Sequence, residues 1–205
     1  MSKLIRIFED NPSQESIDSV VSCLRDGGVV IYPTDTLYGM GCIIDNARSV
    51  ERIIQYKGLK SKGAQFSFIC HDIAQIAEFA MISDANFLLL KRNLPGPFTF
   101  ILPGLSKVPA YFISKRKTVG VRIPANSIPR NIVKALGVPI LTTSIPNEDD
   151  VAYTYHPELI AERWSERVDM IIDGGIGGQE PSTVVDCTGR EVEILRKGKG
   201  VLQLS

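Results

Sequence analysis

The segment GGVVIYPTDTLYGMGCIID, residues 27–45, decides the fold and raises the functional question. Its apolar run at 29–32 has the length and the β-branched content of a short buried strand. The run ends in Pro33-Thr34-Asp35-Thr36, where two hydroxyls and a carboxylate directly follow apolar residues. Ligand sites in open α/β sheets gather in loops beyond strand ends. We therefore ask what these three polar side chains face.

Helical and extended patterns alternate on both sides of this segment. A helix opens at 11–13, carries apolar residues at helical spacing to Leu24, and ends at Gly27-Gly28. Asn46 and Asp72 can each cap a further helix, the first running out near Lys57. The other expected elements are helices at 84–92, 128–136 and 157–167, and strands at 66–70, 98–102, 118–123, 139–143, 168–172, 183–186 and 191–195. With no linker or internal repeat, the pattern predicts a single α/β domain, residues 1–205, with a mixed sheet.

Composition narrows the class of protein. The 205 residues are 44% hydrophobic and 22% charged, close to the average of globular proteins. The formal net charge is zero, so only a local basic patch could support nucleic-acid binding. Four widely spaced cysteines without a CxxC pair favour reduced core thiols over disulfides or a metal site. No signal peptide or membrane-spanning apolar run is present, and we expect a cytoplasmic protein.

The common catalytic motifs are missing from the chain. It has no GxxxxGK[ST] phosphate loop, no GxGxxG and no GxSxG elbow, and its two histidines flank helix starts as caps or surface residues. What remains is a set of polar loops that mix hydroxyls with cations at the ends of elements. These loops are PTDTLYG, YKGLKSKG, KRKTVGVRIP, TTSIPN, PSTVVD and ILRKGKG.

Each loop has a structural explanation as well as a functional one. Hydroxyls after strands often satisfy turn backbone, and lysines at helix ends complement the helix dipole. Taken together, the loops fit a site for phosphate or carboxylate better, because Arg122 ends an apolar strand and needs a partner.

The ordered set of motifs resembles the YrdC/YciO family over about residues 13–204. The motifs are the strand with 34–41, the KG at 57–58, TVGVRIP at 118–124, TTS at 142–144, PSTVVD at 181–186 and LRKG at 195–198. The resemblance implies an α/β fold whose twisted mixed sheet surrounds a basic concave cleft. It also implies an enzyme that condenses L-threonine, bicarbonate and ATP into threonylcarbamoyl-adenylate, with release of pyrophosphate. That product feeds N6-threonylcarbamoyladenosine formation on tRNA.

The same resemblance implies roles for particular residues. Lys57 and Arg122 would stabilise charge during the reaction, with a magnesium ion assisting and no metal site built by the protein itself. Thr34, Arg122, Thr142 and Ser182 would bind the amino acid. Lys57, Lys60, Thr118, Ser144 and Arg196 would bind the nucleotide. The alternative is a protein that binds double-stranded RNA or tRNA through a basic cleft, without efficient catalysis.

The chain departs from the family pattern at several positions. Active synthases typically carry Lys-x-Arg and Ser-x-Asn, whereas this chain has Leu59 and Pro146 where arginine and asparagine are expected. Lys60 and Asn147 lie next to these positions and are candidate substitutes. Cys70 replaces a histidine, and the loop before that strand is about two residues longer. These differences resemble the YciO branch and predict slow catalysis or an altered substrate.

Overall fold

One mixed β-sheet runs through the whole protein. The computed structural model describes residues 2–58, 66–109, 117–146 and 150–204. Within these residues, ten strands form a sheet in the order β1-β8-β2-β3-β7-β4-β6-β5-β9-β10. The strands are β1 (Lys3–Arg6), β2 (Val30–Tyr32), β3 (Gly39–Ile43), β4 (Ser67–Ile69), β5 (Phe98–Pro103), β6 (Thr118–Arg122), β7 (Ile140–Ser144), β8 (Met170–Asp173), β9 (Thr183–Asp186) and β10 (Glu193–Arg196).

Six α-helices and a short 3₁₀ helix flank the sheet in the described part of the chain. They are α1 (Gln14–Arg25), α2 (Ala47–Tyr56), α3 (Ile73–Ala77), α4 (Asp84–Asn93), α5 (Ser127–Leu136), η1 (Val151–Thr154) and α6 (Pro157–Trp164). Side-chain oxygens of Ser13, Asn46, Asp72, Ser83 and Asn126 accept backbone N–H bonds at the starts of the first five α-helices. These caps explain why the helices begin where the sequence predicts.

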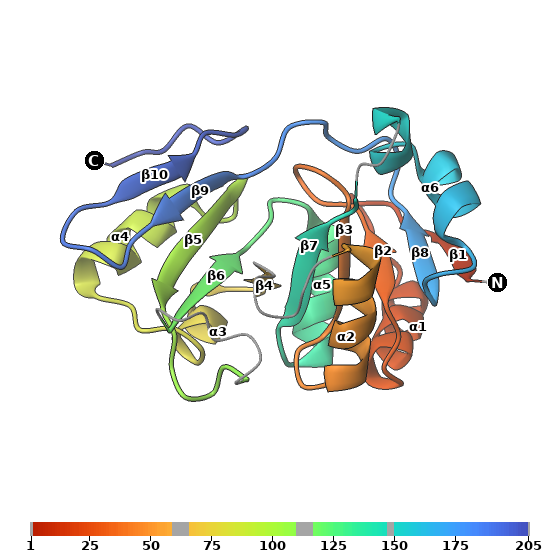
Figure 1. Cartoon of the computed structure of the whole chain (residues 1–205), viewed down its shortest axis with the longest axis horizontal. Coiled ribbons are helices and arrows are strands. Elements are labelled where there is room, and N and C mark those ends of the chain that lie inside the picture. The colour runs from red at the N-terminus through yellow and green to blue at the C-terminus, as the bar shows by residue number, and fades with distance from the viewer. Residues whose placement is uncertain (1, 59–65, 110–116, 147–149, 205) are drawn as a thin grey trace.

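The chain order differs from the order of strands in space. The two termini lie at opposite ends of the sheet, and the segment between β8 and β9 crosses from one end to the other along the top of the view (Figure 1). β2, β3, β7 and β4 are joined by antiparallel ladders, and β4 runs parallel to β6. Strands that are distant in sequence therefore become neighbours in the middle of the sheet.

Two apolar cores stabilise the two faces. The larger core includes Phe68, Phe100 and Trp164 and lies beneath α2, α4 and α6. The smaller core joins α1 and α5 to the other face through Leu24, Ile132 and Ile69. This second core covers only part of its face, and the rest of that face carries the polar residues described below.

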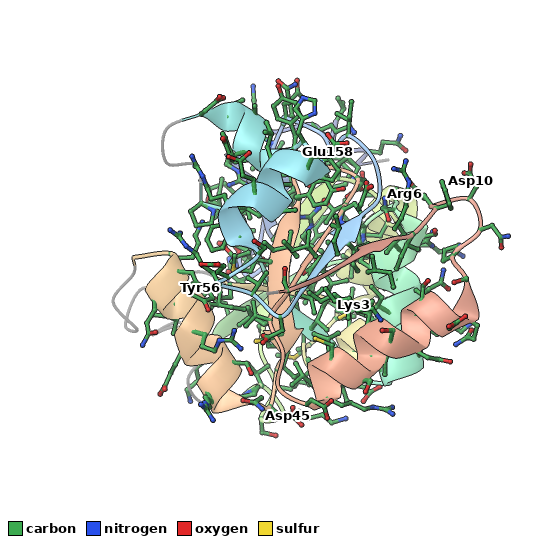
Figure 2. All side chains as sticks on the ribbon, turned by 90° about the vertical axis from the view of Figure 1, so that its right-hand side faces the viewer. Lys3, Arg6, Asp10, Asp45, Tyr56 and Glu158 are labelled. Atoms are coloured by element: carbon green, nitrogen blue, oxygen red, sulfur yellow. The ribbon has the colours of Figure 1, made fainter. Side chains whose placement is uncertain are left out.

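The outer strand β1 presents a charged edge. Lys3 and Arg6, both labelled in Figure 2, lie along β1, which pairs only with β8 among the described strands. Arg6 forms an ion pair of 3.0 Å with Asp173. Cationic side chains on an edge strand discourage pairing with another chain.

The predicted fold class is confirmed, and the differences concern particular elements. The sequence pattern did not predict β1 or β3; β3 contains two glycines, which are depleted in strands. α6 ends at Trp164, three residues before the predicted end at 167, since Ser165 caps it. β8 and β10 are shifted by one to two residues from their predicted ranges. Strand and helix ends of this kind are set by packing as much as by local pattern.

No helix within the described ranges is long and apolar enough to cross a membrane.

Candidate functional site

A row of small and polar residues crosses the centre of the sheet. Register pairs Gly41 with Thr142, Thr142 with Ser67, Ser67 with Gly120, and Gly120 with Ile101. Directly paired residues point to the same face, so these five residues form one continuous row, which we call the cross-strand row. Ser67, Gly120 and Ile101 are partly exposed although they lie on inner strands. The row is therefore open at Ser67, Gly120 and Ile101, the part that we call the uncovered face, whereas Gly41 and Thr142 are buried.

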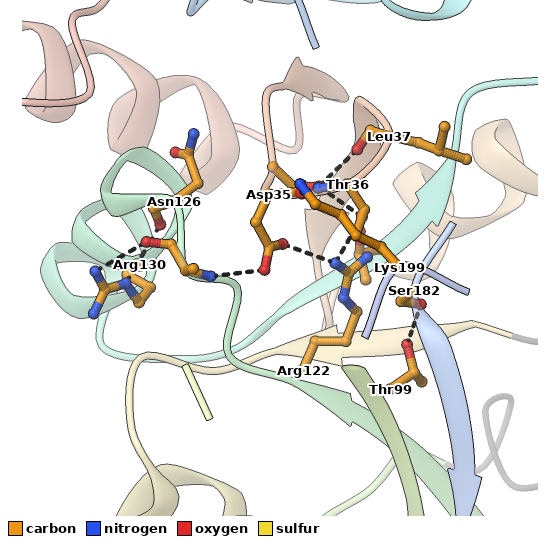
Figure 3. A network of polar contacts seen from close by, with 12 residues as sticks. Asp35, Thr36, Leu37, Thr99, Arg122, Asn126, Arg130, Ser182 and Lys199 are labelled. Atoms are coloured by element: carbon orange, nitrogen blue, oxygen red, sulfur yellow. Dashed lines mark hydrogen bonds and ion pairs between the residues drawn. The ribbon is translucent and has the colours of Figure 1, made fainter. Parts of the chain in front are cut away.

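Arg122 lies on the same face as the cross-strand row, two residues after Gly120. Its Nη2 donates to Asp35 Oδ1 at 3.2 Å and to Thr36 Oγ1 at 2.9 Å, contacts that are drawn in Figure 3. The side chains of Arg122 and Asp35 are only 11% and 10% exposed. Burial lowers the pKa of the Arg122 guanidinium, whereas the charge of Asp35 raises it. Among the described residues, Arg122 Nε has no hydrogen-bond partner although it is buried.

The three polar side chains of the Pro33-Thr34-Asp35-Thr36 loop all form hydrogen bonds. Asp35 Oδ2 accepts from the backbone N–H of Ala125 at 3.0 Å, at the start of the segment leading into α5. Thr34 Oγ1 donates to the carbonyl of Leu37 at 2.7 Å and accepts from the backbone N–H of Thr36. Because the proton of Thr34 is used in this way, the 3.0 Å contact with Thr36 Oγ1 has Thr36 as donor. The loop is thus a closed network that orients Arg122.

A second group of polar contacts lies beside Arg122. Ser182 Oγ is 2.8 Å from Thr99 Oγ1, a pair that Figure 3 shows close to Arg122. Arg196 donates to the Ser182 carbonyl through Nη2 at 2.8 Å and through Nε at 3.2 Å. The charge of Arg196 contributes to lowering the pKa of Arg122. Lys199 Nζ donates to the Asp35 carbonyl at 2.6 Å.

These contacts concentrate positive charge at one end of the uncovered face. Arg122, Arg196 and Lys199 carry three positive charges, and Asp35 supplies one negative charge within the same network. Such an excess, together with the unpartnered Nε of Arg122, favours binding of an anion such as a carboxylate or a phosphate.

The side chain of Lys57 contacts Ser144 at the end of β7. Lys57 caps the C-terminus of α2, and its Nζ donates to the Ser144 carbonyl at 3.1 Å. Burial lowers the pKa of the Lys57 amine. Ser144 ends β7 two residues after Thr142, which places it on the face that carries Arg122. Among the described residues, no hydrogen bond or ion pair joins Lys57 to Arg122, so the Lys57–Ser144 pair is separate from the contacts around Arg122.

Thr142 contacts a buried tyrosine from the strand before the PTDT loop. The hydroxyl of Tyr32 donates to Thr142 Oγ1 at 2.7 Å. The Tyr32 ring lies against Gly39 and Gly41 of β3, where an added Cβ would come within 2.8 Å of ring or hydroxyl atoms. The spacing Gly39-Met40-Gly41 is thus explained by packing of an aromatic ring.

The structure places the predicted site residues in three settings. Arg122 and Arg196 belong to the charged cluster, which also contains Asp35 and Lys199; Ser182 accepts from Arg196, and Thr34 lies in the loop network. Thr142 and Ser144 lie along β7, and Lys57 contacts the latter. Thr118 begins β6 and shares the face of Arg122 by strand alternation. Lys60 lies outside the described residues.

Other residues of this face were not assigned a role from the sequence. The sequence pattern predicted Tyr32 as the end of a buried strand, and Thr99 lies inside an apolar run. Neither pattern indicated a functional role. Asp35 and Thr36 did indicate a function, because two polar side chains directly follow a buried strand. Their partner could not be deduced from the sequence alone. Within the described part of the chain, no group of three or more His, Cys, Asp or Glu side chains could hold a metal ion.

The protein has an α/β fold with a candidate anion-binding site on its uncovered face. Comparison with known proteins identifies its family. A family model for Sua5, YciO and YrdC proteins, described as telomere recombination, matches residues 22–198. The chain therefore belongs to the Sua5/YciO/YrdC family, as the sequence resemblance suggested.

Individual relatives agree with this assignment. The protein YciO of Escherichia coli K12 is 39% identical over 201 residues, covering 98% of this chain and 97% of that protein. The crystal structure of E. coli YciO superposes with a TM-score of 0.90 at 38% identity, covering 98% of both chains. The structure of P. abyssi Sua5 complexed with L-threonine has a TM-score of 0.86 at 29% identity, covering 96% of this chain and 58% of that one.

Proposed function

We propose that this protein is an ATP-using enzyme of the threonylcarbamoyl-adenylate synthase type. It would condense L-threonine, bicarbonate and ATP and release pyrophosphate, and its product would feed modification of tRNA. The observation that carries the proposal is the Arg122 guanidinium: it is fixed by Asp35 and Thr36, and its buried Nε has no partner among the described residues. The similarity to Sua5, a relative whose structure contains L-threonine, supports an amino-acid substrate.

The proposed chemistry fits the residue types of the face. The amine of L-threonine and bicarbonate give a carbamate with loss of water, and the carbamate oxygen attacks the α-phosphorus of ATP while pyrophosphate leaves. This route needs no nucleophilic side chain, and the protein acts by positioning and by stabilising charge. Arg122 would hold the carboxylate, and Arg196 and Ser144 would face the nucleotide. A slow rate or an altered amino acid fits the departures at Leu59 and Pro146.

Magnesium would enter this reaction with the nucleotide. Asp35 is the carboxylate of the charged cluster, and both of its oxygens are engaged, by Arg122 and by the N–H of Ala125. Mg²⁺ bound in proteins takes one or two carboxylates or relies on substrate phosphates and water. The described residues do not fit a protein-held magnesium site, so we assign the ion to the MgATP substrate.

The experiment that tests the proposal measures turnover directly. Purified protein is incubated with MgATP, bicarbonate and L-threonine, and pyrophosphate and the adenylate are quantified. We expect pyrophosphate release that requires all three substrates. Arg122→Ala removes one charge-assisted contact, worth about 1.5–3 kcal/mol, and lowers the rate by roughly 10- to 150-fold.

Arg52→Ala serves as the matched control. Arg52 is a partly buried arginine that forms a 2.7 Å ion pair with Asp169 outside the charged cluster. We expect its substitution to leave turnover unchanged. Pyrophosphate release that ignores L-threonine, or equal rates for Arg122→Ala and wild type with intact folds, contradicts the proposal.

Binding of double-stranded RNA or tRNA is the alternative function. It requires a patch of exposed cations large enough for a nucleic-acid backbone, but Arg122, the central cation of this face, is only 11% exposed. Lys117 is the described member of the basic run 115–117, whose other two residues lie outside the described residues. We therefore favour the small-molecule substrate. RNA affinity that falls steeply with salt, without any turnover, would favour the alternative.

A cytoplasmic location belongs to the same proposal, because ATP and tRNA meet there. All four cysteines are free thiols, and Cys42, Cys70 and Cys187 are buried. This usage is common in reducing compartments.

A further inference from the structure

We propose that Tyr32 is a positioning residue that fixes Thr142 as a hydrogen-bond donor toward the ligand, so that the ligand group bound there is an oxygen acceptor such as a carboxylate. This inference rests on the proposed function, since it describes how the amino-acid site of that reaction distinguishes its substrate. It concerns a residue, Tyr32, to which neither the sequence motifs nor the relatives assign a role.

The direction of the Tyr32–Thr142 hydrogen bond carries the argument. A threonine hydroxyl has one proton to donate and two lone pairs that accept. Because Tyr32 donates to Thr142 Oγ1 at 2.7 Å, one lone pair of Thr142 is occupied and its own proton points away from the phenol. No acceptor for this proton is found among the described residues, although Thr142 is only 5% exposed. A buried donor of this kind is costly unless a partner takes its proton.

The position of Thr142 shows where such a partner would lie. Thr142 belongs to the cross-strand row, opposite Ser67 and beside Gly41, next to the uncovered face. Arg122 lies on the same face and is close enough that its positive charge acts on the Tyr32 hydroxyl, opposing the rise in the pKa of Tyr32 that burial causes. Two donors, the Thr142 hydroxyl and the Arg122 guanidinium, therefore share one face of the sheet with the Tyr32 hydroxyl. Both can donate to an anionic oxygen, and the charge of Arg122 disfavours an ammonium group.

The packing around Tyr32 holds the phenol in place. Tyr32 is 1% exposed, and its ring occupies the space that side chains at Gly39 and Gly41 would fill. β3 pairs directly with β7, so the ring reaches across β3 to Thr142 without a gap. A rigid donor of this kind sets the rotamer of the Thr142 hydroxyl before a ligand binds, which reduces the entropy lost on binding.

A double-mutant cycle tests whether Tyr32 acts through Thr142. Calorimetry measures the dissociation constants of L-threonine and of 1-amino-2-propanol, which lacks the carboxylate, for wild type, Tyr32→Phe, Thr142→Val and the double variant. We expect each single substitution to weaken L-threonine binding by roughly 3- to 10-fold, the range for loss of one hydrogen bond. The double variant should bind no more weakly than Thr142→Val, because Tyr32 has no effect once its partner is gone. 1-Amino-2-propanol should bind weakly and respond little to either change.

Tyr38→Phe is the matched control. Tyr38 is also fully buried and comes from the same segment, but its hydroxyl bonds with Gly175 and Gly174 and has no contact with Thr142. We expect unchanged ligand affinity in this variant. Thr142→Ser, which keeps the hydroxyl, should restore most of the affinity lost in Thr142→Val. Thermal unfolding of every variant separates loss of the fold from loss of the contact.

The outcomes separate this inference from the proposed function. Additive effects of the two substitutions, or equal losses for L-threonine and 1-amino-2-propanol, overturn the positioning role. If wild type binds no L-threonine, the proposed amino-acid substrate is wrong, and the same cycle is run with pyrophosphate as the acceptor. Coupling between Tyr32 and Thr142 toward pyrophosphate then supports the positioning role with a phosphate oxygen in place of the carboxylate. Absence of coupling toward both ligands overturns the inference entirely.

Discussion

At the scale of single residues, buried charge in this protein is held by specific partners. Arg122 would be costly on an apolar strand if it were unpaired, and Asp35 and Thr36 together engage its Nη2. Asp35 in turn is fixed by the backbone of Ala125. The Nε of Arg122, which has no partner among the described residues, is therefore a defined donor in a rigid setting, which suits recognition of an anion.

The buried thiol of Cys42 makes stability depend on alkaline pH. Cys42 is 0% exposed, and burial raises the pKa of its thiol from 9.0 to about 12. Above pH 9 the unfolded chain loses this proton while the native chain keeps it, so stability falls as pH rises toward 12. We expect Cys42→Ala to reduce the loss of unfolding free energy between pH 8 and 10 by about 1.4 kcal/mol in urea titrations.

Met40→Ala is the control for this pH effect. Met40 lies two residues away in the same core but does not titrate, so its substitution lowers stability equally at both pH values. A pH dependence that is identical in Cys42→Ala and wild type would show that Cys42 is not responsible.

At the scale of elements, β3 shows how one strand serves both packing and the candidate site. Gly39 and Gly41 leave room for the Tyr32 ring on one face of the sheet. Met40 and Cys42 belong to the larger core on the other face. The strand pairs with β2 on one side and with β7 on the other. β3 thereby connects the strand before the PTDT loop to the strand that carries Thr142 and Ser144.

Substitution of Gly41 tests this close approach. A methyl group at position 41 would collide with the Leu141 carbonyl and lie 2.8 Å from the Tyr32 hydroxyl. We expect Gly41→Ala to lower the unfolding free energy by about 1–3 kcal/mol, the usual cost of overpacking, in chemical denaturation. Gly189→Ala is the control, since its nearest neighbour would be 3.4 Å away. Equal stability of the two variants would mean that the Tyr32 ring is not tightly held by β3.

At the scale of the whole molecule, the sheet order assembles the site from segments far apart in the chain. Arg122 and Asp35 are 87 positions apart, and Lys199 reaches back 164 positions to the Asp35 carbonyl. Lys57 of α2 donates to the carbonyl of Ser144 in β7, and these two residues are 87 positions apart. The crossing between β8 and β9, seen along the top of Figure 1, leads into β9 at Thr183. Ser182, directly before β9, accepts from Arg196 of this cluster.

The Lys57–Ser144 contact brings the two diverged motifs together. Pro146 follows Ser144 by two positions, and Leu59, which follows Lys57 by two positions, lies outside the described residues. Arginine and asparagine would add a guanidinium fork and an amide that leucine and proline cannot supply. We expect Leu59→Arg combined with Pro146→Asn to raise threonine-dependent pyrophosphate release by roughly 10²-fold, if each contact contributes about 1.5 kcal/mol.

The two single variants serve as controls for this restoration, and each should give a smaller gain. A wild-type rate equal to that of a relative with both motifs, measured side by side, would contradict the prediction. It would indicate that Lys60 and Asn147 already supply the missing groups.

Much of the fold followed from local patterns. Buried apolar runs predicted β2, β4 and β7, and capping residues predicted where α1, α2 and α3 begin, because these signals depend on neighbours within a few positions. For the candidate site, the sequence identified polar loops at strand ends and a need for a partner at Arg122. It did not identify Tyr32, Thr99 or Lys199 as contacts of those residues.

The sequence by itself determined the α/β class, the family resemblance and the hydroxyls and cations from which a site is built. Only the tertiary structure decided that Asp35 pairs with Arg122, that Tyr32 donates to Thr142, and that a glycine-containing segment becomes a central strand. The physical reason is that these features depend on pairing between segments 87 to 110 positions apart. Local propensity carries no information about such pairing; burial of the two cores and the register of the ladders fix it.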